Sequence, residues 1–294
     1  AFLPVIYEAD REDDILSPTT WAKANPNYGV SLKEDYMQRE ALKAQTLPSY
    51  ENIFRRLHLN QWTASETRWM PDHKWVACNE TIDQEILKNY PCWGGLDLAN
   101  NRDLSAFVLV WEIDEKFVYK HWTFVPEDKV LQRTGGKDGV NYLEWSDHLE
   151  ITSGDVADHN FIQAKIMQLG ELYNIQSIAF DRHYASQLVL KLMDEGFNMS
   201  PFGQGYKSFN PPILEFEKRI LEQKIIHFNC PVLRWQIGNA VLELSNTEQM
   251  KIQKGKAKDK IDTIIAMIMA TGEMLFGERE KASIYSSQQG IRSV

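Results

Sequence analysis

The segment between Cys92 and Val110 constrains the fold of this chain more than any other stretch. An apolar lead-in ends at Asp97, a polar turn follows, and an uninterrupted apolar run begins at Ala106. This pattern is typical of a buried strand that carries one carboxylate, turns back and pairs with its neighbour. Later segments alternate between strand-like and helix-like patterns, so we predict an α/β fold with a mixed sheet flanked by helices.

Two later segments repeat the arrangement of an acid beside an apolar run. Asp181 follows the short apolar strand 178–180, and Asp262 lies on a helix whose opposite side is apolar. An unpaired charge in apolar surroundings is costly, although any one of these acids also fits a cap or turn residue. Asp97 and Asp181 fall at strand ends, where an α/β sheet opens a crevice. We therefore expect the three acids to meet.

Carboxylates are hard oxygen ligands, which Mg²⁺ and Mn²⁺ prefer. A phosphodiesterase of the two-metal kind places two such ions about 4 Å apart around the scissile phosphate. Asp97, Asp181 and Asp262 are therefore predicted to be metal ligands and catalytic residues that hold two Mg²⁺ or Mn²⁺ ions for hydrolysis of a phosphodiester.

Three further residues are auxiliary candidates for this site. Asp103 is the other candidate metal ligand in the segment that contains Asp97, but its position favours a role in stabilising the turn at 100–105. Asp259 precedes Asp262 by three residues and so lies on the same helical face. It is either a fourth acid of the site or the helix N-cap, and we favour the N-cap. His183 follows Asp181 closely and can contact a phosphate, although a lone histidine is more often structural.

Basic residues gather directly before Asp262, whereas the whole chain has a formal net charge of -9. Such a run can attract DNA through its phosphates, or it can be an ordinary solvated loop. The candidate DNA-binding residues are Lys251, Lys254, Lys256, Lys258, Lys260 and Arg102.

Other features restrict the class of protein. The 294 residues include no apolar run of membrane-spanning length and no secretory signal. The three cysteines are scattered, which favours a reduced, cytoplasmic protein. The segment 134–138 departs from a P-loop, so ATP hydrolysis by that motif is not expected of this chain. The chain begins without methionine and is expected to be a fragment or a processed product.

Periodicity and capping signals predict the secondary structure. Strands are expected at 105–113, 117–125 and 177–180, a loop at 128–139, a helix and an edge element within 141–152, and helices at 32–46, 50–57, 160–174, 185–195, 211–223, 230–244 and 258–276. We divide the chain into a small, mainly helical linker subdomain (1–90), an α/β domain (91–277) and a disordered tail (278–294).

Several of these motifs together resemble the large terminase subunit of tailed bacteriophages. The resemblance covers roughly residues 1 to 275 and depends on the order and spacing of the motifs. They are 94–98 with 102–106, 179–181, 229–235 with Asn239, and 261–262 leading into a helix rich in Ala and Met; upstream they are 24–29 and 54–62.

The resemblance implies an RNase H-like nuclease domain that cuts concatemeric double-stranded DNA during genome packaging in the host cytoplasm. It places metal ligands at Asp97, Asp181 and Asp262, makes 1–90 the end of an ATPase domain and a linker, and puts the packaging ATPase before Ala1. Expected partners are the portal protein and the small terminase subunit. Two alternatives stay open: a non-catalytic docking or assembly module, and an actin-like or sugar-kinase fold that binds ATP.

Overall fold

The computed structural model describes residues 3–61, 69–98, 104–133, 142–155, 158–182, 186–245, 247–253 and 260–282. The chain forms two compact units, Ala1–Pro71 and Asp72–Val294.

The smaller unit is mainly helical, as predicted for the start of the chain. Its helices are α1 (Pro18–Ala24), α2 (Glu34–Thr46) and α3 (Pro48–His58). Just after α3, Asn60 has a positive φ of 53°, and its amide donates to the carbonyls of Tyr7 and Ala24. Asn60 therefore ties the end of α3 to two earlier segments of the same unit.

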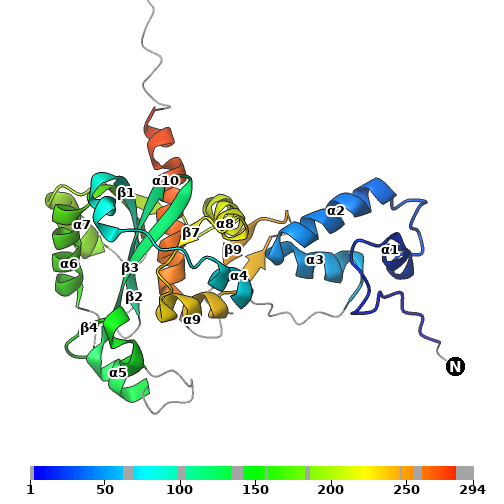
Figure 1. Ribbon diagram of the computed structural model, residues 1–294, viewed down its shortest axis with the longest axis horizontal. Coiled ribbons are helices and arrows are strands. Elements are labelled where there is room, and N and C mark those ends of the chain that lie inside the picture. Colours follow the sequence, from blue (N-terminus) through cyan, green and yellow to red (C-terminus); the bar gives the residue numbers. More distant parts are fainter. Residues whose placement is uncertain are drawn as a thin grey trace, which may run out of the picture. The chain divides into compact units, whose positions relative to one another are not determined.

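The larger unit is built on a seven-stranded mixed sheet in the order β4-β3-β2-β1-β5-β6, with β7 beside β3 (Figure 1). β1 pairs antiparallel with β2 and parallel with β5, so β1 lies near the centre of the sheet. The strands are β1 (Pro91–Asp97), β2 (Ser105–Ile113), β3 (Lys116–Pro126), β4 (Glu150–Thr152), β5 (Asn174–Asp181), β6 (Met199–Phe202) and β7 (Ile225–Ile226); β8 (Leu242–Leu244) and β9 (Met250–Ile252) form a separate ribbon.

Helices cover this sheet on its two faces. The helical segments are α4 (Asp72–Ala77), η1 (Gln84–Asn89), α5 (Glu127–Arg133), η2 (Tyr142–His148), α6 (His159–Leu172), α7 (Ser186–Asp194), α8 (Tyr206–Leu221), α9 (Pro231–Asn239) and α10 (Asp262–Ala282). Apolar side chains of α6 and α7 pack with Leu96 and Phe107 in one core cluster. α10 packs on the opposite face against β1, β2 and β5, with α8 and α9 beside it. None of the described helices is long and apolar enough to cross a membrane.

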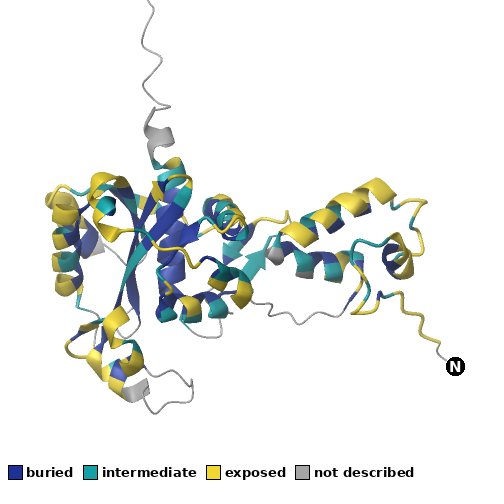
Figure 2. Cartoon of the chain, in the orientation of Figure 1, coloured by how far each residue is buried: buried dark blue, intermediate teal, exposed yellow. Residues whose placement is uncertain are grey.

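α10 is buried on all sides along its first part (Figure 2). Every residue from 261 to 273 is buried, so protein surrounds this part of the helix on all sides. Close approach to the sheet is possible because β1 has a glycine there. A Cβ placed on Gly95 would lie 2.0 Å from the Ala266 carbonyl oxygen.

α4 and η1 pack with the sheet, so the compact units divide before the boundary that we predicted at residue 90. Trp75 of α4 stacks on His227 with ring centroids 4.1 Å apart. The indole N–H of Trp111 in β2 donates to the Leu87 carbonyl of η1. These contacts attach residues 72–90 to the larger unit.

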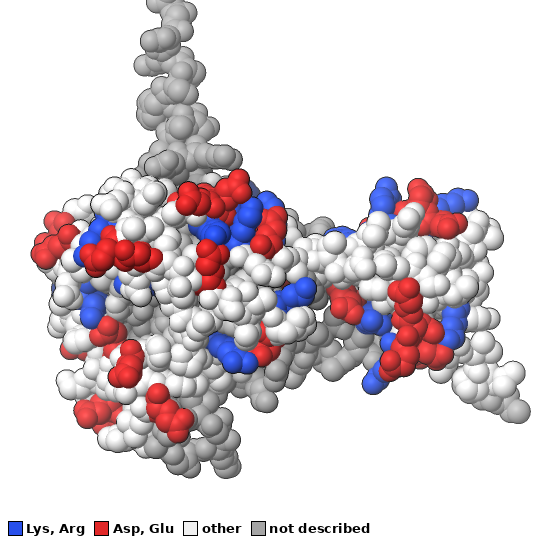
Figure 3. Space-filling view, in the orientation of Figure 1, with Lys and Arg blue, Asp and Glu red and all other residues white. Residues whose placement is uncertain are grey.

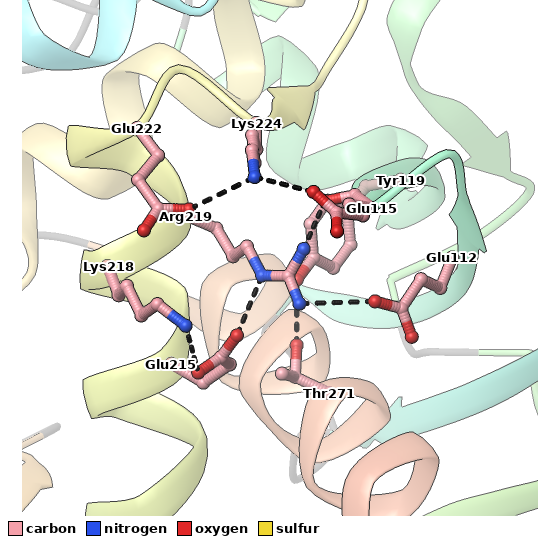
Figure 4. Close-up of polar contacts among 9 residues, drawn as sticks. All are labelled: Glu112, Glu115, Tyr119, Glu215, Lys218, Arg219, Glu222, Lys224 and Thr271. Carbon is pink, nitrogen blue, oxygen red and sulfur yellow. Dashed lines mark hydrogen bonds and ion pairs between the residues drawn. The ribbon is translucent and has the colours of Figure 1, made fainter.

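The β2–β3 turn has both of its central residues, Asp114 and Glu115, at positive φ, as in a type I′ hairpin, although neither is Asn or Gly. An ion-pair network supports this turn from α8 (Figure 4). Arg219 pairs with Glu215 at 2.7 Å and with Glu112 at 3.1 Å, and donates to the Glu115 carbonyl. Lys224 pairs with the Glu115 carboxylate at 2.9 Å. Charges from outside the hairpin thus hold a turn whose own residues fit it poorly.

The strands predicted at 105–113 and 117–125 are confirmed, whereas the strand predicted at 177–180 begins earlier, at Asn174, and other predicted boundaries are wrong. α8 begins at Tyr206 rather than at Pro211, and both of its prolines lie inside the helix. α9 ends at Asn239, where β8 follows closely, and α5 occupies part of the predicted loop 128–139. α10 begins at Asp262 and continues to Ala282, into the predicted tail; residues 283–294 of that tail lie outside the described residues.

Candidate active site

Asp97 and Asp181 end two neighbouring strands at the same level. Leu96 of β1 is paired with Phe180 of β5 in a parallel register, so the next residues along the two strands are the two aspartates. Asp97 is also paired with Ala106, and Ala106 with Thr123. One row across the sheet therefore runs from Thr123 through Ala106 and Asp97 to Asp181.

The aspartates in this row are on the face that α10 covers. Gly95 lies two residues before Asp97 and contacts the α10 backbone. Ser177 lies four residues before Asp181, and its hydroxyl donates to Glu273 of α10 at 2.7 Å. Since side chains alternate between the faces of a strand, Asp97 and Asp181 are on the α10 face as well.

α10 runs opposite to β3, and therefore opposite to β1, which brings Asp262 to the same row. The Tyr119 hydroxyl bonds the Thr271 hydroxyl at 2.8 Å, and further along β3 the Thr123 hydroxyl bonds the Thr263 hydroxyl at 2.8 Å. The helix thus begins beside Thr123, the residue that shares a row with Asp97. Asp262, the first residue of α10, lies at this end of the sheet.

All three carboxylates are buried, with exposed fractions of 1% for Asp97, 7% for Asp181 and 7% for Asp262. Placing several buried carboxylates at one end of one face is costly without cations or hydrogen-bond donors nearby. Within the described residues, no group of three or more His, Cys, Asp or Glu side chains is arranged to hold a metal ion as it stands. The backbone thus gathers the three acids at one end of one face.

A chain of polar groups, most of them buried, fixes the beginning of α10, and the sequence patterns did not reveal it. Gln236 of α9 accepts from the Thr263 backbone N–H at 2.8 Å and donates to the Thr263 hydroxyl at 2.9 Å. The Thr263 hydroxyl bonds the Thr123 hydroxyl, which in turn bonds Nδ1 of His121 at 3.1 Å. The other ring nitrogen of His121, Nε2, bonds the Cys230 thiol at 3.0 Å. Gln236 is fully buried, and its side-chain amide bonds Thr263 at the beginning of α10.

Two histidines near these elements predict acid sensitivity of the fold. Burial lowers the pKa of His121 to about 4, with the His148 charge adding to the effect, and burial also lowers the pKa of His227. The unfolded chain takes up protons at these histidines near pH 6.5, before the folded protein does. The free energy of unfolding therefore decreases as the pH falls below about 6.5. We expect a loss of about 1–2 kcal/mol between pH 7 and pH 5. The loss is no larger because His121 is partly exposed and solvent screens its charge.

Urea unfolding at several pH values tests this prediction. His227→Phe should flatten the pH dependence, whereas His73→Gln, at an exposed position in α4, should leave it unchanged. Equal slopes for the wild type and His227→Phe would show that His227 does not contribute.

The auxiliary candidates Asp103, His183 and Asp259 lie outside the described residues, as do Arg102, Lys254, Lys256 and Lys258. Lys251 lies on β9, where it pairs with Glu243 at 3.1 Å and sits over the Tyr206 ring. Acidic and basic side chains are interspersed on the visible face of the larger unit (Figure 3). A DNA-binding role for these basic residues therefore stays a prediction.

A family model described as "Terminase large subunit, endonuclease domain" matches residues 1–278. The large terminase subunit of Enterobacteria phage HK97 is 32% identical over 271 residues, which are 91% of this chain and 53% of that protein. Protein YmfN of Escherichia coli strain K12 is 28% identical over 306 residues, 99% of this chain and 67% of that protein.

The crystal structure of the HK97 bacteriophage large terminase has a similar fold, with a TM-score of 0.65 at 31% identity. The similarity covers 90% of this chain and 56% of that one, so this chain spans about half of the HK97 protein. The mixed sheet flanked by helices is thus the RNase H-like arrangement that we predicted. By its sequence and its fold, the chain belongs to the family of terminase large subunit endonuclease domains.

Proposed function

We propose that the chain is a metal-dependent endonuclease that cuts concatemeric double-stranded DNA during phage genome packaging. Asp97, Asp181 and Asp262 would hold two Mg²⁺ or Mn²⁺ ions. The observation that carries this proposal is the row in which Asp97 and Asp181 end adjacent parallel strands on the face that α10 covers. Family membership supports nuclease activity in general.

Each acid contributes through its position in the fold. Asp97 and Asp181 are held by strand pairing on both sides of their strands, which keeps the distance between their backbones constant. Asp262 is in the first turn of a helix, where the backbone N–H groups favour negative charge. The cations would lower the pKa of a bound water and stabilise the leaving oxygen. Oxygen-only ligands of this kind suit Mg²⁺ and Mn²⁺ rather than a soft metal.

The proposal extends to the partners, the location and the further activity of the longer protein. The partners would be double-stranded DNA, the portal protein and the small terminase subunit, in the host cytoplasm, and the longer protein would also be an ATPase. The family assignment replaces the actin-like or sugar-kinase alternative. A non-catalytic assembly module is the competing function, because family membership by itself does not require that the acids act.

A plasmid assay separates the two. The purified chain is incubated with supercoiled plasmid and Mg²⁺ or Mn²⁺, and gel electrophoresis measures nicked and linear DNA. We expect both products with at least one of the metals and none after addition of EDTA, because cleavage depends on the cations. Intact plasmid with both metals, across protein concentrations, would favour the assembly module.

A further inference from the structure

The polar side chains at the beginning of α10 form bonds to two other elements, α9 and β3. The first four backbone N–H groups of a helix have no partner within the helix. Here the N–H of Thr263 is bonded by a buried side chain from another helix, Gln236 of α9. The same amide also bonds the Thr263 hydroxyl, so two bonds from one side chain fix one residue.

The orientation of the Gln236 amide follows from its partners. The Thr263 backbone N–H can only donate, so the oxygen of Gln236 faces it and the nitrogen faces the Thr263 hydroxyl. The Thr263 hydroxyl in turn bonds Thr123, which lies in the row of Asp97. Gln236 therefore connects α9, the start of α10 and the aspartate row of the sheet.

We propose that Gln236 is a positioning residue that sets where Asp262 stands relative to Asp97 and Asp181. This inference rests on the proposed function, since it assigns Gln236 a role in the metal site. Asp262 is the residue directly before Thr263 and the first residue of α10. Gln236 and Thr123 constrain its position through Thr263. Residues that orient metal ligands typically change metal affinity or activity 10–100-fold when they are replaced.

The chain offers a matched control on the same helix. The Tyr119 hydroxyl bonds Thr271 at 2.8 Å, which is also a buried bond between β3 and α10, and Figure 4 shows both residues. Thr271 lies more than two turns beyond Asp262. Tyr119→Phe therefore removes a comparable bond from the same interface without loosening the beginning of the helix.

Mn²⁺ binding, followed by electron paramagnetic resonance, and plasmid cleavage test the proposal together. Gln236→Met should raise the Mn²⁺ concentration for half-occupancy by about 10–100-fold and lower kcat, with KM for DNA unchanged. Excess Mn²⁺ should restore part of the activity. Thr263→Val, which is close in shape to the wild type, is the second test variant in case Gln236→Met does not fold, and it should weaken Mn²⁺ binding in the same way. Thr263→Ser keeps the hydroxyl and should retain wild-type binding. Tyr119→Phe should bind Mn²⁺ as the wild type does.

Two results would overturn the inference while the proposed function stands: wild-type Mn²⁺ binding in Gln236→Met and Thr263→Val, or equal weakening in Tyr119→Phe. If the wild-type chain neither binds Mn²⁺ nor cuts DNA, the proposed function fails and the positioning role fails with it. If the wild type binds Mn²⁺ without cutting, the binding comparison still decides the role of Gln236.

Discussion

Asp97→Asn is expected to lower metal-dependent DNA cleavage by about 10³-fold or more, equivalent to about 4 kcal/mol of transition-state stabilisation. Asn keeps the shape of the side chain but removes the negative charge that a divalent cation needs. Asp97 is 1% exposed and lies beside Asp181, so neutralising it also relieves repulsion between buried carboxylates. We therefore expect the metal-free variant to melt at the same temperature as the wild type or at a higher one.

Thermal unfolding with and without Mn²⁺ measures the metal contribution directly. A ligand that binds only the folded state stabilises it, by about 2.7 kcal/mol at a concentration 100 times its Kd. The wild-type melting temperature should rise with Mn²⁺, and that of Asp97→Asn should rise much less. The control is Asp194→Asn at the exposed end of α7, which should cleave and respond to Mn²⁺ as the wild type does. Full cleavage by Asp97→Asn would refute the metal site proposed here.

Gly95→Ala is expected to destabilise the larger unit by about 4 kcal/mol or more. The added Cβ would lie 2.0 Å from the carbonyl oxygen of Ala266 and 2.8 Å from the backbone N of Ala270. Both are backbone atoms of a buried helix, so no side-chain rotation can make room. α10 would have to move away from β1, and Asp262 would move with it. Urea unfolding should therefore show lower stability, and any folded protein should cut DNA poorly.

Two other glycines provide controls for Gly95→Ala. A Cβ on Gly94 would approach side-chain atoms of Ile178 at 2.9 Å and Phe107 at 3.1 Å, which can adjust, so Gly94→Ala should cost only about 1–2 kcal/mol. Gly238 in α9 has open space around it, and Gly238→Ala should stabilise the fold by about 0.5–1 kcal/mol. Similar losses for Gly94→Ala and Gly95→Ala would contradict the close approach of α10.

The local pattern of the sequence was enough to predict β2, β3, most of β5 and the placement of two acids. The apolar run that begins beside Ser105 forms β2, because a segment with such a composition is stable only when both of its faces are covered. Asp97 and Asp181 lie at strand ends, as predicted, because each interrupts an apolar segment.

Where the prediction failed, contacts from outside the segment decided the structure. α8 includes Pro211 and Pro212 and begins before them, since packing on α10 stabilises a helix that local preference would start later. α10 begins at Asp262 because Gln236 and Thr123 bond Thr263, and neither partner is near it in sequence.

The sequence by itself determined where β2, β3 and β5 run, which of them ends in an acid and which family the motifs resemble, because these depend on residues that are close together in the chain. Only the tertiary structure decided the pairing of β1 with β5, which makes Asp97 and Asp181 neighbours. It also decided the direction of α10 over Gly95, which brings Asp262 to the same end of the sheet. Strand register and helix direction depend on contacts between residues far apart in the chain, and periodicity in one segment carries no information about them.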